Sequence, residues 1–205
     1  MQLDSKKFTW LGIFFLVLGW SAWKPHDYPT WWLEVLPALV ALVILAATRK
    51  RFPLTPLVYW LILLHAVILM VGGHYTYAEV PLGDWVAEWT GGSRNNYDKL
   101  GHFAQGFVPA MVAREILLRN RVVARRAWLS PIVVSICLAI SAFYELIEWW
   151  VALLSGEGAE AFLGTQGYVW DTQSDMFLAL SGAVLALLLL SGLHDRQLRK
   201  LEKTS

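Results

Sequence analysis

Three pairs of ionisable residues, each set at helical spacing, are the part of the sequence best suited to chemistry. The pairs are Asp98 with His102, Glu145 with Glu148, and Asp171 with Asp175, which are four, three and four residues apart. Residues at these spacings lie on one face of an α-helix, one turn above each other. Each pair falls in or at the edge of a long apolar run, where an ionisable group is costly unless it has a partner or a function. The three pairs therefore mark a candidate site.

A divalent metal ion fits this combination of residues. Carboxylates gathered in one small volume cannot all stay ionised unless a cation balances them. Carboxylates together with an imidazole suit Mg²⁺, Mn²⁺ or Zn²⁺. The predicted metal ligands are Asp98, His102, Asp171 and Asp175. Glu145 and Glu148 are the predicted catalytic residues, one of which would act as general base on a bound water.

Purely structural roles for several of these residues stay open at this point. Asp98 and Asp171 each precede an apolar run, so either fits the N-cap position of its helix. Glu145 can be protonated and hydrogen bonded to Tyr144 or His102, and a buried neutral network of that kind needs no metal.

Other ionisable residues receive weaker interpretations. Glu148 can reach the lipid headgroups instead of the site, because two tryptophans follow it. His74 lies at the predicted depth of the cluster and could join it, although a single histidine is more often structural. Arg114 and Glu115 are interpreted as a helix-end ion pair without a functional role.

The loop before the last apolar run is predicted to cover the candidate site. It extends over residues 156–170, is acidic, and contains Gly158, Gly164 and Gly167, which allow tight turns. Thr165 and Gln166 would then face the site. The sequence contains no phosphate-binding P-loop, nucleophile elbow or zinc-protease helix motif, so the familiar soluble chemistries have no support.

Long apolar runs must position these residues. Of the 205 residues, 57% are hydrophobic and only 16% are charged, which excludes an ordinary soluble globular protein. A membrane span needs about 20 apolar residues, so six spans leave no room for a second soluble domain. We predict an all-α, polytopic membrane bundle that forms one domain over residues 1–205. The six predicted transmembrane helices cover residues 8–23, 31–47, 54–72, 99–118, 128–154 and 172–193.

Charge and aromatic patterns orient this bundle. The first run lacks an A-x-A-like cleavage signal, so it is expected to be a retained span. Lys and Arg concentrate before it, in every second loop, and after the sixth run, which predicts cytoplasmic N and C termini. The 12 Trp fall mostly near predicted span ends, as in an interfacial belt. The outer loop at 73–97 contains apolar residues at helical spacing, which predicts a helix lying in the interface. Cys137 is the single cysteine, which excludes a disulfide framework or a cysteine-based metal cluster.

Three segments carry a resemblance to a known family. They are YDKLGHFAQGFVPA at 97–110, AFYELIEWW at 142–150 and FLGTQGYVWDTQSDMFLAL at 162–180. They resemble the YjdF-type bacterial inner-membrane proteins, and the similarity extends over essentially the whole chain. The resemblance implies a multi-pass protein of the bacterial inner membrane, and it implies no particular activity.

The sequence is also similar, more weakly, to the VanZ-like membrane proteins. The residues that match their pattern are Asp98, Lys99 and His102, then Glu145 or Glu148, then Asp175 and Gly182. Ala179 stands where that family has Asn, and the short stretch before Asp175 lacks the arginine that the family has there. This second resemblance implies a substrate linked to the cell envelope or to peptidoglycan.

These observations lead to one functional hypothesis and two alternatives. The leading hypothesis is a multi-pass inner-membrane protein whose periplasm-facing cluster of acids and histidine binds a divalent metal. If the protein is an enzyme, it would hydrolyse or transfer a group on an envelope lipid. The first alternative is a small proton-coupled transporter, although the inner halves of the spans are mostly Leu, Val, Ile and Ala. The second is a non-catalytic membrane scaffold. The expected partner is the lipid bilayer, and no nucleic-acid partner is expected because the basic loops serve topology.

Overall fold

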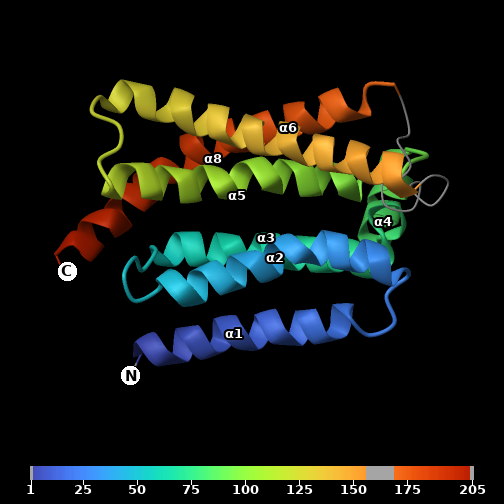
Figure 1. Ribbon diagram of the computed structural model, residues 1–205, viewed down its shortest axis with the longest axis horizontal. Helices are drawn as coiled ribbons and strands as arrows, with labels where there is room; N and C mark the ends of the chain where they lie inside the picture. Colours follow the sequence, from blue (N-terminus) through green and yellow to red (C-terminus); the bar gives the residue numbers. More distant parts are fainter. Residues whose placement is uncertain (1, 156–168, 204–205) are drawn as a thin grey trace. The chain divides into compact units, whose positions relative to one another are not determined.

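The computed structural model describes residues 2–155 and 169–203, and all regular structure within these residues is helical (Figure 1). The α-helices are α1 (Gln2–Ser21), α2 (Tyr28–Thr48), α3 (Pro56–Tyr75), α4 (Pro81–Thr90), α5 (Tyr97–Arg119), α6 (Leu129–Ser155) and α8 (Asp171–Glu202). Two short 3₁₀ helices, η1 (Tyr77–Glu79) and η2 (Arg126–Trp128), precede α4 and α6. Each of the six predicted apolar runs forms a helix, which confirms the all-α prediction for the described residues.

Among the described residues, four segments are long and apolar enough to cross a membrane. They are Tyr28–Thr48, Pro56–Tyr75, Arg126–Val151 and Asp171–Glu202. The helices α1 and α5 have 20 and 23 residues, which matches the length of a membrane span, but both are less apolar. In α5 the cause is the set of ionisable residues that the sequence places within it. The prediction of six spans therefore stays a prediction for α1 and α5.

The chain divides into two compact units. The first combines Met1–Phe52 with Trp60–Gly101, and the second combines Pro53–Tyr59 with His102–Ser205. The divisions fall inside α3 and α5, so each of these helices contributes to both units.

In the first unit, polar contacts at the helix ends connect α1, α2 and α3. Asp27 is the N-cap of α2 and accepts a hydrogen bond from the backbone N–H of Thr30 at 2.8 Å. The indole of Trp31 donates to the hydroxyl of Ser21 at 3.2 Å. The Nδ1 atom of His74 lies 3.0 Å from the backbone carbonyl of Ser21. These contacts give His74 a structural role at the end of α3.

A helix is present within residues 73–97 as predicted, and it is α4. Its exposed apolar side chains are Leu82, Trp85, Val86 and Trp89, whereas Gly83 and Ala87 face inward. The Asn95 side chain donates hydrogen bonds of 2.8 Å to the carbonyl of Val80 and to Asp84, which ties the following loop to the helix. Such a division between an apolar face and an anchored face suits a helix lying at a membrane surface.

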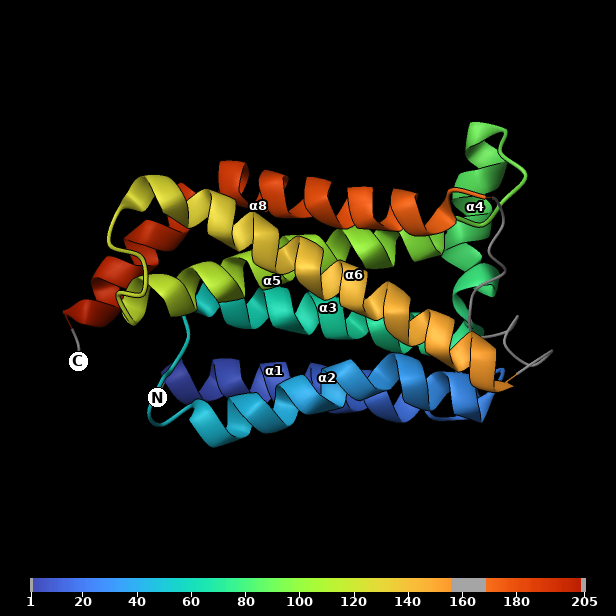
Figure 2. The same cartoon turned by 45° about the horizontal axis from the view of Figure 1, so that its top comes forward.

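In the second unit, α5, α6 and α8 run side by side (Figures 1 and 2). Small residues face inward along α8, where Ala179, Ala183 and Ala186 are fully buried. A Cβ atom added to Gly106 of α5 would overlap the backbone carbonyl of Ala179. One added to Gly182 of α8 would in turn overlap the carbonyl of Phe103. Glycine therefore permits backbone contact between α5 and α8, as is common between membrane helices.

The last helix is longer than predicted. It continues to Glu202 rather than ending at Leu193, so its charged C-terminal part is helical as well.

The predicted tryptophan belt agrees with the exposure of the tryptophan side chains. All of the tryptophans except Trp10 and Trp31 are exposed, as side chains in contact with lipid headgroups would be.

Candidate functional site

The second unit brings together residues from three helices around His102. This histidine lies on α5, five residues after the helix begins, and Glu145 lies in the C-terminal half of α6. Asp175 follows the first turn of α8. Their side chains are buried, with exposed fractions of 5%, 8% and 4% for His102, Glu145 and Asp175. Three ionisable groups far apart in the sequence thus share one buried region.

The imidazole of His102 lies between two carboxyl groups. Its Nδ1 atom is 3.7 Å from Oε1 of Glu145, and its Nε2 atom is 3.9 Å from Oδ2 of Asp175. Both distances are within ion-pair range and longer than an ordinary hydrogen bond. The ring of Tyr144 also packs edge-on to the imidazole, with centroids 6.3 Å apart. His102, a predicted metal ligand, therefore lies between Glu145, a predicted catalytic residue, and Asp175, a further predicted ligand.

Glu148 completes a group of three possible ligands. One ligand atom from each of His102, Glu145 and Glu148 lies within 4.8 Å of the others. Glu148 is only partly exposed, whereas Trp149 and Trp150 beside it are exposed. The carboxyl group is thus turned toward the site and the two indoles away from it, which argues against the headgroup role for Glu148.

The residues around His102 fit a divalent cation. One imidazole and several carboxylates form a donor set typical of Zn²⁺ and Mn²⁺ sites. Ligand atoms bound to one such ion at about 2.1 Å in tetrahedral geometry are about 3.4 Å apart. The observed distance of 3.7 Å between His102 and Glu145 is close to this value, so small side-chain movements would suffice for coordination.

The two remaining predicted ligands, Asp98 and Asp171, are not members of the group formed by His102, Glu145 and Glu148. Asp171 is buried in the first turn of α8, where Trp170 occupies the N-cap position. Asp98 lies in the first turn of α5, four residues before His102, and belongs to the first unit. Neither aspartate is the N-cap of its helix, so that alternative is wrong for both. The predicted ligand roles of Asp98 and Asp171 stay predictions.

The predicted lid lies mostly outside the described residues. Thr165, Gln166 and the three loop glycines belong to residues 156–168. His74, which was considered as a further member of the cluster, instead contacts the carbonyl of Ser21 and packs against Trp20 with ring centroids 4.4 Å apart.

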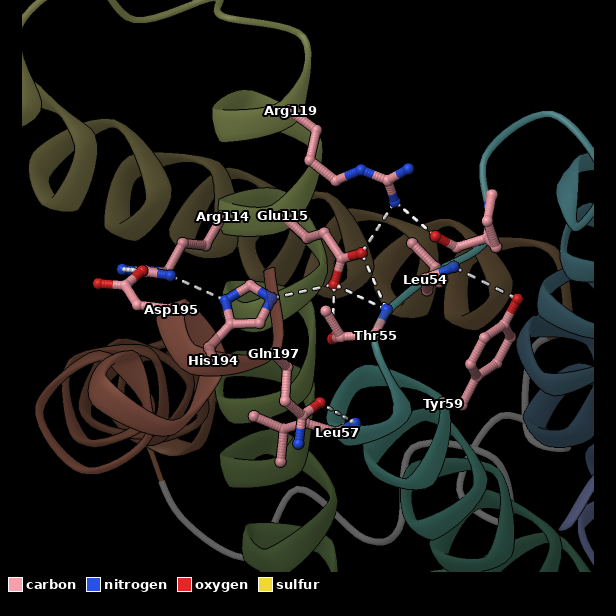
Figure 3. A network of polar contacts seen from close by, with 11 residues as sticks. Leu54, Thr55, Leu57, Tyr59, Arg114, Glu115, Arg119, His194, Asp195 and Gln197 are labelled. Carbon is pink, nitrogen blue, oxygen red and sulfur yellow. Dashed lines mark hydrogen bonds and ion pairs between the residues drawn. The ribbon is translucent and has the colours of Figure 1, made fainter. Parts of the chain in front are cut away.

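A second buried polar group lies at the opposite end of α5 and α8, centred on Glu115 (Figure 3). The Glu115 side chain is completely buried. It accepts hydrogen bonds from the backbone N–H of Thr55 at 2.9 Å and from the Thr55 hydroxyl at 2.7 Å. Arg119 donates to it at 3.1 Å, and Nε2 of His194 lies 2.9 Å away. The start of α3, the end of α5 and the extended part of α8 are joined through this one carboxylate.

The partners of His194 determine its protonation. Arg114 contacts Nδ1 of His194 at 2.8 Å and donates to Asp195 at 2.7 Å (Figure 3). A guanidinium group can only donate hydrogen bonds, so Nδ1 of His194 must be the acceptor. The ring is then neutral and carries its hydrogen on Nε2, where it donates to Glu115. Three arginines, Arg114, Arg119 and the exposed Arg126, contact the carboxylates of Glu115 and Asp195, so both negative charges are offset by arginine and need no metal.

The interpretation of Arg114 and Glu115 as an ion pair with each other is wrong. Adjacent residues on a helix point in different directions, so the two side chains reach separate partners. The C-terminal parts of α5 and α8 are also more polar than expected. The sequence did contain a signal for this buried polar network, namely the pair His194 and Asp195, which directly follows the predicted end of the last span.

Comparison with known proteins agrees with this architecture. Residues 7–196 match the family described as "Predicted membrane protein (DUF2238)". The chain is 58% identical over 185 residues to "Inner membrane protein YjdF" of Escherichia coli (strain K12), which covers 90% of this chain and 88% of that protein. No solved structure matches the chain.

Proposed function

The chain belongs to the DUF2238 family of predicted membrane proteins, and on this premise we propose that it is a bacterial inner-membrane protein that binds a divalent metal at His102. The observation that carries the proposal is the grouping of His102, Glu145 and Glu148, whose ligand atoms lie within 4.8 Å of one another. An imidazole and two carboxylates from adjacent helices supply the donors that Zn²⁺ or Mn²⁺ prefers.

Each residue of the group has a distinct role in this proposal. His102 and Glu145 anchor the ion, because both are buried on facing helices. Asp175 faces the other ring nitrogen of His102 and orients the imidazole, as carboxylates commonly do behind histidine ligands. Glu148 is the more exposed of the two glutamates, so it can exchange between the ion and water and serve as general base.

The proposed topology places the site on the periplasmic side. With six spans and cytoplasmic termini, the start of α5, the end of α6 and the start of α8 are all outer ends. A metal bound there would polarise a phosphoryl or carbonyl oxygen of an envelope lipid. Glu148 would accept the proton of the attacking water, and the buried faces of the three helices would exclude bulk water. Asp98 and Asp171 are proposed as further oxygen donors on the strength of their spacing.

Elemental mass spectrometry of the detergent-purified protein tests the metal site. We expect close to one Zn or Mn per wild-type chain, and loss of the metal in His102→Ala and Glu145→Gln. The matched control is the exposed pair of His26 and Glu79, whose atoms are 3.0 Å apart. His26→Ala should keep the metal. A folded wild-type protein without bound metal after growth in metal-supplemented medium would refute the proposal.

The second candidate function is proton-coupled transport. It gains support from the buried ionisable residues at both ends of α5, with His102 near one end and Arg114 near the other. Between Gln105 and Arg114 the helix carries only apolar residues and glycine, over about 13 Å at 1.5 Å per residue. Proton flux into liposomes that contain the protein would favour this function, and its loss in His102→Ala would connect it to the site.

A further inference from the structure

We propose that the candidate site continues one helical turn deeper as an uncharged subsite, formed by Gln105 and Ser141, that binds a hydroxyl group. The hydroxyl belongs to water in the free protein and to the ligand when one is bound. This inference rests on the proposed function in that it describes what binds beside the metal.

Two buried polar atoms point to this subsite. Ser141 on α6 is completely buried, and its hydroxyl oxygen has no hydrogen-bond partner among the described residues. The side-chain oxygen of Gln105 on α5 is likewise buried and has no partner within that part of the chain. Buried polar atoms in folded proteins are nearly always hydrogen bonded, and the exceptions commonly mark a bound water or ligand.

Both residues lie on the faces that carry the site. Ser141 precedes Glu145 by four residues, and Gln105 follows His102 by three. At these spacings side chains lie on the same helix face, about 4.5 to 6 Å apart along the axis. On α6 this face also includes Val133 and Cys137, which are both completely buried, so Ser141 points into the second unit and not toward its surface. α5 and α6 run in opposite directions (Figure 1). Gln105 comes one turn after His102 and Ser141 one turn before Glu145, so both lie on the same side of the metal-binding group, toward the middle of their helices.

The chemistry of the two side chains restricts what binds. The amide oxygen of Gln105 only accepts hydrogen bonds, whereas the hydroxyl of Ser141 both donates and accepts. A deprotonated phosphate or carboxylate oxygen cannot donate to Gln105. Water or an alcohol can satisfy both atoms at once, and a hydroxyl bound here lies one turn from the proposed ligands His102 and Glu145. The subsite therefore favours a ligand with a free hydroxyl, such as a glycerol or sugar headgroup.

Thermal unfolding of the full chain in detergent separates a filled subsite from an empty one. Ser141→Ala and Gln105→Met remove the polar atoms with little change in volume. If the two atoms bind one hydroxyl, each variant lowers the Tm by about 2 to 6 °C, which follows from one lost hydrogen bond in a chain of this size. The double variant then loses less than the sum of the two, because both residues share one ligand. The matched control is Ser135→Ala on the exposed side of α6, which should leave the Tm unchanged.

The same variants distinguish the two proposals when their metal content is measured. A lowered Tm with retained metal supports the subsite, since the charged ligands of the ion are intact. An unchanged or raised Tm with retained metal overturns the subsite and leaves the metal site standing. If the wild type binds no metal, but the single variants lower the Tm and the double variant lowers it by less than the sum of the two decreases, the result supports the hydroxyl subsite and refutes the proposed function. Added glycerol provides a direct probe: it should raise the Tm of the wild type more than that of Ser141→Ala, and an equal rise in both counts against the subsite.

Discussion

Replacing Glu115 with glutamine removes the central acceptor of the buried network in the C-terminal parts of α5 and α8. The carboxylate accepts from Thr55 through both oxygens and also contacts His194 and Arg119. Glutamine has nearly the same shape but only one oxygen, so its NH₂ group must face donors in either orientation. The substitution also removes the carboxylate that pairs with Arg119, while Asp195 continues to pair with Arg114 and Arg126.

The size of the effect follows from the burial of Glu115. The side chain is completely buried, so solvent does not weaken its interactions. Hydrogen bonds to a charged group contribute about 1.5 to 3 kcal/mol each, and removing one partner of a buried ion pair costs about 3 to 5 kcal/mol. We therefore expect the free energy of unfolding to fall by about 3 to 5 kcal/mol. In a chain of this length that corresponds to a decrease in Tm on the order of 10 °C.

Thermal unfolding of the purified protein, followed by circular dichroism, measures this change. Glu202→Gln is the matched control, because Glu202 is exposed at the end of α8 and should change the Tm very little. Thr55→Val removes only the hydroxyl donor, so its effect should be smaller, and the double variant with Glu115→Gln should be less than additive. A Glu115→Gln protein that unfolds within 1 °C of the wild type would refute the network as a stabilising element.

Three further outcomes are expected. Asp175→Asn should weaken metal binding about 10- to 100-fold without abolishing it, since it removes the carboxylate behind His102. Titration of the metal-free protein with Mn²⁺ measures this affinity, and an unchanged affinity contradicts the orienting role of Asp175. Gly106→Val should lower both the Tm and the metal content, because any added side chain overlaps the backbone of α8; normal values for both would show that the close approach is unnecessary. Burial raises the pKa of Tyr97, whose hydroxyl donates to the carbonyl of Ile68 at 3.1 Å. The unfolded chain therefore loses this proton first as the pH rises above about 10, stability falls there, and Tyr97→Phe should show a smaller drop in Tm between pH 8 and pH 11 than the wild type.

Local sequence patterns were sufficient to locate the helices. Each long apolar run forms a helix, and the periodic apolar residues between residues 73 and 97 form α4. Local sequence patterns were also sufficient to place His102 near the start of its helix, Glu145 in the C-terminal half of its helix and Asp175 near the start of its helix. Both results depend on hydrophobicity and helical spacing, which are properties of neighbouring residues. The same patterns did not determine the helix ends, since α8 continues beyond its apolar part.

Tertiary packing decided which side chains meet. The rotation of each helix about its axis places the ring of His102 between Glu145 and Asp175 and turns Glu148 inward. Close approach at Gly106 sets the spacing of α5 and α8. The same packing separates Arg114 from Glu115 and pairs each with partners on other segments, a result that adjacency in the sequence had obscured. Partner choice depends on contacts between segments far apart in the chain, so helical spacing alone cannot determine it.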